Sequence, residues 1–131
     1  MFRLSRPLLN QLRKTTTGIT GLKVHHDPIP ELTNVYQSTL TLLSSIPETS
    51  VYRQGVEALT QRKLKIVQGA DGNITEVEKQ LDEGHIEESL DIARDELNLV
   101  SKMMEWKAWE PLVEKPEDGQ WQYFGKTATA S

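Results

Sequence analysis

The chain has 131 residues, which is enough for one domain of ordinary size and too few for two. Hydrophobic residues make up 37% and aromatic residues 6% of the sequence, so its core must be thin. The absence of cysteine excludes iron–sulfur ligation, thiolate zinc sites, cysteine nucleophiles and disulfides. No run of residues reaches the roughly 18 apolar positions that a membrane-spanning helix needs.

Charge is distributed unevenly around a net value of −4. Residues 1–26 contain five basic residues and no acidic residue, whereas the rest of the chain contains ten basic and all 19 acidic residues. Nucleic-acid phosphates are bound by clustered basic side chains on a folded surface. The excess of acidic residues after residue 26 therefore argues against nucleic acid as a partner.

Residues 1–14 form a basic, amphipathic segment. Leu4, Leu8 and Leu12 recur every four residues, which places them on one face of a helix. An arginine-rich, acid-free, amphipathic N-terminus is typical of a mitochondrial targeting segment. The alternative is a basic surface helix or a disordered tail.

Residues 15–29 predict an extended arm, because threonine and glycine dominate the first part and two prolines end it. Gly18 and Gly21 are candidate partner-contact residues, since a backbone without side chains allows close approach of a neighbour. Pro28 and Pro30 are unsuited to a helix interior but suit the first turn of a helix.

Hydrophobic spacing predicts three longer helices, over about 30–46, 50–68 and 85–107, and a short helix over about 73–83. We therefore predict an all-α fold: a small three-helix bundle with an extra short helix over residues 30–107, flanked by extended N- and C-terminal arms. The last helix has the clearest apolar stripe, which consists of Ile86, Leu90, Ala93, Leu97, Val100 and Met104. Its opposite, predicted solvent-facing side carries Glu87, Asp91, Arg94 and Lys102.

Polar residues mark where two of these helices begin. Thr49 or Ser50 is expected to cap the second helix, and Asn73 or Thr75 the short one. Thr75 also fits the spacing of a capping box with Glu78.

The C-terminal part changes character. Residues 108–124 predict an aromatic and proline-rich arm that contacts a partner, and residues 125–131 a disordered polar tail. Large aromatic side chains supply much of the binding energy at interfaces. The alternative is that Trp106 and Trp109 fold back over the core of the bundle, and a mixed arrangement has one ring inward and one outward. The candidate partner-contact residues of this region are Trp106, Trp109, Pro111, Leu112 and Trp121.

No catalytic, cofactor-binding or metal-binding residue is predicted. The turn at residues 69–73 imitates a calcium loop, but glycine stands at its first position and glutamine at its twelfth. The acidic residues of the last helix could supply a pair of carboxylates, although acids on a helix face usually serve solvation. These acids are Glu87, Glu88, Asp91, Asp95 and Glu96. A small enzyme that uses them is a further alternative.

The chain resembles an accessory subunit of mitochondrial respiratory complex I, in the family called NADH:ubiquinone oxidoreductase 1 alpha subcomplex subunit 5. The resemblance covers residues 14–124. Its marks include Thr16-Thr17-Gly18, Gly21-Leu22, Glu96-Leu97-Asn98-Leu99, Glu105-Trp106-Lys107 and Trp109-Glu110-Pro111-Leu112-Val113-Glu114. Ala108 departs from the family, which usually has proline there.

The resemblance implies a non-catalytic subunit that supports assembly or stability of the matrix-facing peripheral arm of complex I. It implies docking on other complex I subunits, chiefly the core iron–sulfur protein 3 subunit of the quinone module. It implies no cofactor, and contact with the inner membrane only through the complex. The alternative function is a transient assembly chaperone or adaptor in the matrix.

Overall fold

The computed structural model describes residues 14–120, 122–123 and 126–127 of the chain. The predictions made for residues 1–13, for Trp121 and for most of the C-terminal tail lie outside these residues. The described residues form the helices α2 (Pro28–Leu43), α3 (Val51–Gly69), α4 (Ile74–Leu81) and α5 (Ile86–Trp106), followed by two short strands. The prediction of a small all-α bundle with one extra short helix is confirmed.

Local chemistry explains where the helices begin. Helix α2 starts at Pro28, two residues earlier than predicted, because proline suits the first helical position. The hydroxyl of Ser50 accepts a hydrogen bond from Arg53 N at the start of α3. The side chain of Asn73 caps α4 by accepting from Glu76 N, so the capping box predicted for Thr75 is wrong.

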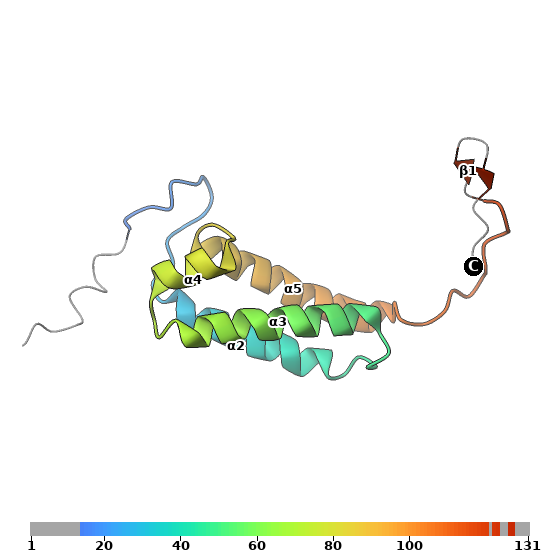
Figure 1. Ribbon diagram of the computed structural model, residues 1–131, viewed down its shortest axis with the longest axis horizontal. Coiled ribbons are helices and arrows are strands. Elements are labelled where there is room, and N and C mark those ends of the chain that lie inside the picture. The colour runs from blue at the N-terminus through green and yellow to red at the C-terminus, as the bar shows by residue number, and fades with distance from the viewer. Residues whose placement is uncertain (1–13, 121, 124–125, 128–131) are drawn as a thin grey trace, which may run out of the picture.

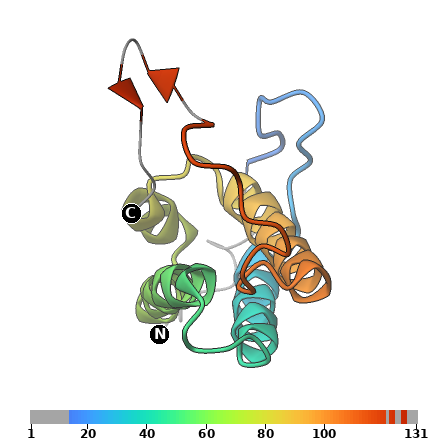
Figure 2. The same ribbon diagram turned by 90° about the vertical axis from the view of Figure 1, so that its right-hand side faces the viewer.

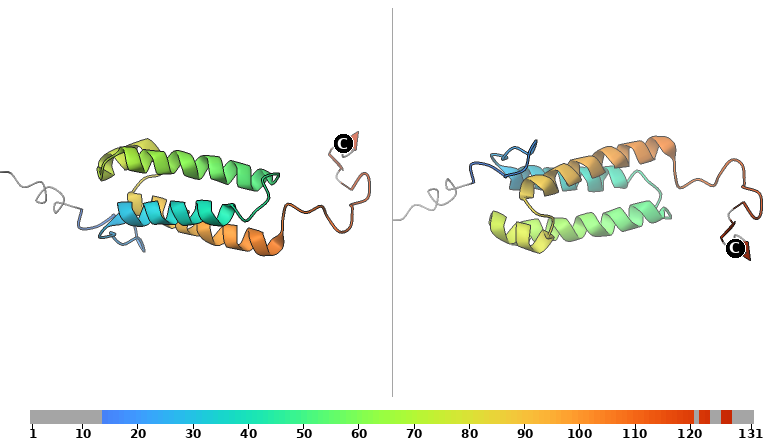
Figure 3. Two further views of the ribbon diagram at one scale, coloured as in Figure 1. Left: turned by 90° about the horizontal axis from the view of Figure 1, so that it is seen from below. Right: turned by 90° about the horizontal axis from the view of Figure 1, so that it is seen from above.

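The three long helices run side by side along the length of the molecule (Figure 1). Helix α2 packs against both α3 and α5, and the end-on view of Figure 2 shows it between them. Helix α4 and the N-terminal segment lie at the end where α5 begins, whereas residues after Trp106 leave from the opposite end (Figure 3). The bundle therefore presents a different non-helical segment at each end.

The core consists of two clusters along the bundle. The first, near α4, contains Leu32, Tyr36, Val67, Val77, Ile86, Leu90 and Ala93. The second, near the end of α5, contains Leu43, Ile46 and Val100, with partly buried side chains around it. Most of the apolar stripe predicted for the last helix is buried in these clusters. Within the described residues, no helix is long and apolar enough to cross a membrane.

The two flanking segments differ in structure. Residues 14–27 contain neither helix nor strand, as predicted, but they fold back on the bundle as a loop. Beyond α5, residues 110–118 are exposed along their whole length. The strands β1 (Gln122–Tyr123) and β2 (Lys126–Thr127) then pair antiparallel in a hairpin that the sequence did not predict.

Candidate functional site

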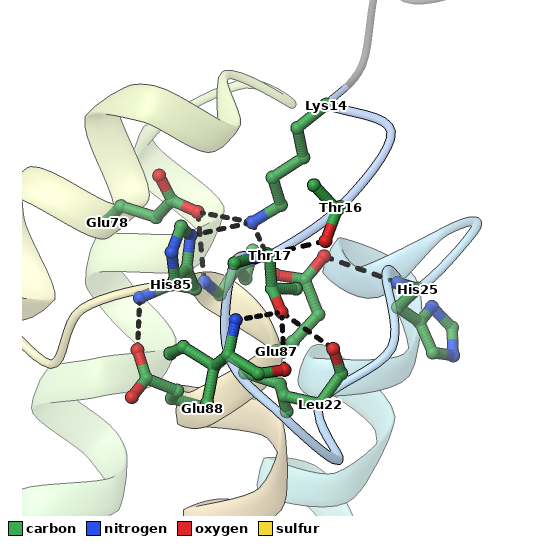
Figure 4. A network of polar contacts seen from close by, with 12 residues as sticks. Lys14, Thr16, Thr17, Leu22, His25, Glu78, His85, Glu87 and Glu88 are labelled. Atoms are coloured by element: carbon green, nitrogen blue, oxygen red, sulfur yellow. Dashed lines mark hydrogen bonds and ion pairs between the residues drawn. The ribbon is translucent and has the colours of Figure 1, made fainter.

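The N-terminal loop is attached to the bundle by a network of polar contacts (Figure 4). The ammonium group of Lys14 lies 2.6 Å from Glu87 Oε2 and 2.9 Å from His85 Nδ1. Glu78 Oε1, from α4, lies 3.6 Å from the same ammonium group. Three side chains from the α4–α5 region therefore surround one cation that belongs to the loop.

Glu87 is the central group of this network. Its side chain is only 3% exposed, and its second oxygen, Oε1, accepts a hydrogen bond from His25 N at 3.2 Å. Burial by itself raises the pKa of Glu87, but hydrogen bonds from Lys14, its own backbone N–H and His25 N–H outweigh burial and hold the pKa below its ordinary value. The ionised form is therefore the one that the fold stabilises.

The donor atoms of Glu78, His85 and Glu87 lie within 4.8 Å of one another, close enough to share a metal ion. In this structure, the ammonium group of Lys14 lies among them and supplies the positive charge. The arrangement accordingly binds a lysine of the same chain.

The remaining acidic residues of α5 do not converge on one site. Glu88 Oε2 accepts from His85 N at 2.7 Å and caps the helix. Glu96 Oε1 accepts from the Tyr52 hydroxyl at 2.6 Å, which links α5 to α3, and together with burial this contact raises the pKa of Tyr52. Asp91 and Asp95 are exposed. These carboxylates serve capping, helix–helix contact or solvation, so their geometry supports no paired acid–base site.

The C-terminal end of α5 exposes a second surface, formed by residues 106–113. Trp106 is 63% exposed and Leu112 is 73% exposed, while the side chain of Val113 is fully exposed. Trp109 instead packs partly buried against the cluster of Leu43, Ile46 and Val100. One indole ring thus faces inward and the other outward, which is the mixed arrangement among the sequence-based alternatives.

The other candidate contact residues are placed as follows. Pro111 is exposed within the same C-terminal surface, and Trp121 lies outside the described residues. Gly18 and Gly21 are exposed in the N-terminal loop and have φ angles of 73° and 85°. Those left-handed conformations favour glycine, and a Cβ atom at either position would meet no other atom within 4 Å. The described candidates therefore fall into two groups at opposite ends of the bundle.

Sequence reasoning missed the contact between Lys14 and Glu87. It assigned Glu87 to the solvent-facing side of the last helix, whereas the structure buries this residue. The error arose because the loop that covers Glu87 has no periodic pattern from which its packing could be deduced. No sequence signal singles out Lys14 from the other basic residues before Asp27 as the partner of Glu87.

These features define a class of protein: a small helical bundle with a polar, internally anchored loop at one end and exposed apolar side chains at and beyond the end of its last helix. A family model described as "ETC complex I subunit conserved region" matches residues 21–88. The chain belongs to the family of NADH dehydrogenase [ubiquinone] 1 alpha subcomplex subunit 5, and the resemblance seen in the sequence is confirmed.

Individual relatives match over most of the chain. The subunit of Candida albicans named NADH dehydrogenase [ubiquinone] 1 alpha subcomplex subunit MCI4 is 44% identical over 125 residues, covering 95% of this chain and 89% of the relative. Subunit 5 of Bos taurus is 41% identical over 112 residues, covering 86% and 96%. A probable subunit 5 of Arabidopsis thaliana, named as mitochondrial, is 39% identical and covers 81% of this chain and 62% of the relative.

Proposed function

We propose that the chain is a non-catalytic accessory subunit of mitochondrial respiratory complex I that supports assembly or stability of the matrix-facing peripheral arm. One observation carries the proposal: a member of this family exposes Trp106 at the end of α5, and Leu112 and Val113 in the segment that follows it. Large apolar side chains exposed so close together along the chain favour a protein contact. The partner that the family resemblance implies is the core iron–sulfur protein 3 subunit of the quinone module, on the matrix side of the inner membrane.

Trp106 and Leu112 offer a better test than Trp109. Trp109 packs against the core, so its replacement by alanine would also destabilise the bundle. Trp106 and Leu112 are mostly exposed, and truncating them leaves the core intact. Loss of one interface tryptophan typically costs about 2 kcal/mol, which corresponds to roughly thirtyfold weaker association.

The test uses cells that lack the endogenous chain and express Trp106→Ala or Leu112→Gln. We expect less assembled peripheral arm on native gels, with unchanged NADH oxidation per assembled enzyme. Leu59→Gln is the matched control, because Leu59 is 51% exposed on α3, away from this surface. Normal assembly of both variants would contradict the proposal, and a wild-type chain that is absent from the mature complex would favour the transient chaperone instead.

A further inference from the structure

The N-terminal loop, residues 14–25, is closed at both ends by one buried carboxylate. Glu87 Oε2 accepts from the side chain of Lys14 at 2.6 Å, where the loop begins, and Glu87 Oε1 accepts from the backbone N–H of His25 at 3.2 Å, where it ends. Figure 4 shows both contacts converging on Glu87. Because this carboxylate is almost fully buried at the start of α5, it fixes the ends of the loop to a rigid element.

Hydrogen bonds within the loop fix its interior. The Thr17 side chain is buried, and its hydroxyl donates to Leu22 O at 2.6 Å and accepts from Ile19 N at 3.3 Å. Leu22 N donates to Ile19 O at 3.2 Å, which closes a turn around the tip. Gly21, the third residue of this turn, adopts the left-handed conformation that glycine favours, and so does Gly18, just before the turn. The loop therefore has one defined shape without a partner.

The tip of this loop exposes an apolar side chain that is surrounded in the sequence by uncharged residues. Ile19 is 43% exposed, and its neighbours from Thr15 to Gly21 carry no charge. The charge of Lys14 is already matched by Glu87 and Glu78. Lys23 is the only other lysine or arginine of the loop, and a phosphate-rich surface would require a cluster of cations, so the tip fits an uncharged, apolar protein surface better than nucleic acid or lipid headgroups.

We propose that residues 14–25 are a preformed docking loop, positioned by Glu87, that inserts Ile19 into an apolar socket on another complex I subunit. The inference rests on the proposed function for the identity of the partner. It differs from that function in assigning a second contact, at the opposite end of α5 from Trp106. Because the loop is ordered before it binds, little conformational entropy remains to be lost on docking.

Two pairs of variants separate the contact made by Ile19 from the positioning of the loop by Glu87. Ile19→Ser removes the apolar side chain from the tip, and Ile92→Ser is its matched control, because Ile92 is 47% exposed on α5. Glu87→Gln removes the charge that holds Lys14 and keeps the size of the side chain. Lys14→Met removes the same ion pair from the other side, which guards against a folding defect specific to Glu87→Gln.

The contact is measured by competition. Each variant is co-expressed with an equal amount of wild-type chain, and the two forms are counted by mass spectrometry in purified complex I. We expect incorporation of Ile19→Ser to fall about tenfold relative to wild type, as loss of one buried isoleucine implies. Ile92→Ser should compete equally with wild type. Equal incorporation of Ile19→Ser would overturn the docking contact.

The positioning role is measured on the isolated chain by hydrogen exchange. Glu87→Gln and Lys14→Met should each speed amide exchange in residues 14–25 at least about fivefold, whereas exchange in α2 should speed up by no more than the loss of stability measured in urea accounts for. Unchanged exchange in the loop would overturn the positioning role of Glu87.

Failure of the loop contact and failure of the proposed function give different experimental outcomes. If Trp106→Ala and Leu112→Gln assemble normally while Ile19→Ser does not, the loop contact stands and the aromatic surface is excluded. If the aromatic variants fail and Ile19→Ser competes normally, the loop contact is overturned and the proposed function stands. If wild-type chain is absent from mature complex I, the partner assignment is overturned, and the exchange experiment still decides whether Glu87 positions the loop.

Discussion

Replacing Lys14 and replacing Glu87 should destabilise the fold by different amounts, although both changes remove the same ion pair. Glu87 has a 3% exposed side chain, whereas the Lys14 side chain is 27% exposed. Lys14→Met leaves a buried carboxylate without its cation. Glu87→Gln leaves an ammonium group that can turn into water and that still lies near Glu78 and His85. Lys14→Met should therefore cost more stability than Glu87→Gln.

The expected loss of stability follows from how deeply the two side chains are buried. Removing one partner of a fully buried ion pair costs about 3–5 kcal/mol, and a fully exposed pair contributes about 0–1 kcal/mol. The pair of Lys14 and Glu87 lies between these limits because only one partner is buried. We expect a loss of about 2 kcal/mol for Lys14→Met and about 1 kcal/mol for Glu87→Gln.

Urea denaturation of the two single variants and the double variant measures the coupling. For a small domain, a loss of about 2 kcal/mol lowers the midpoint by about 1 M urea. The double variant should lose less stability than the sum of the single variants, because the neutral methionine and glutamine leave no unmatched charge. Additivity within about 0.5 kcal/mol, or a larger loss for Glu87→Gln than for Lys14→Met, would refute this account of the pair.

Two further predictions concern the core and the pH dependence. Leu90→Ala removes a fully buried side chain from the first cluster and should cost about 2–5 kcal/mol in urea denaturation, whereas Val113→Ala should change stability by less than about 0.5 kcal/mol. The folded-state pKa of Glu87 lies below its ordinary value of 4.5, so its contribution is present above that pH and is lost as the pH falls through the lower, folded-state pKa. Wild type should therefore lose more stability than Glu87→Gln on acidification below about pH 4.5, and parallel curves would contradict this.

The helices could be predicted because residues close together in the sequence determine them. The apolar stripe of α5 repeats every three or four residues, and most of it is buried as the period requires. Ser50 and Asn73 cap helices through hydrogen bonds that reach only three residues along the chain. The predicted helix ends still differ by up to a few residues, since Ser44 ends α2 before Pro47 forces it to stop.

The loop contacts could not be predicted because they join residues that are far apart in the sequence. Lys14 and Glu87 are separated by 73 positions, and no repeat or turn relates them. Glu87 lies opposite the apolar stripe of the last helix, which is why it was assigned to solvent. Only the folded loop shows that this carboxylate also has to neutralise Lys14 and accept from His25 N.

The positions of the two proposed contacts determine how much each one contributes to assembly with a partner. The N-terminal loop attaches at the first turn of α5, and Trp106 is the last residue of that helix. A helix of 21 residues is about 30 Å long, so the two contacts cannot share one small socket on a partner. Once one contact has formed, the rigid bundle holds the other near its own site at a high effective concentration. Weakening either contact alone should therefore lower total assembly measurably, and lower incorporation further when the variant competes directly with wild-type chain.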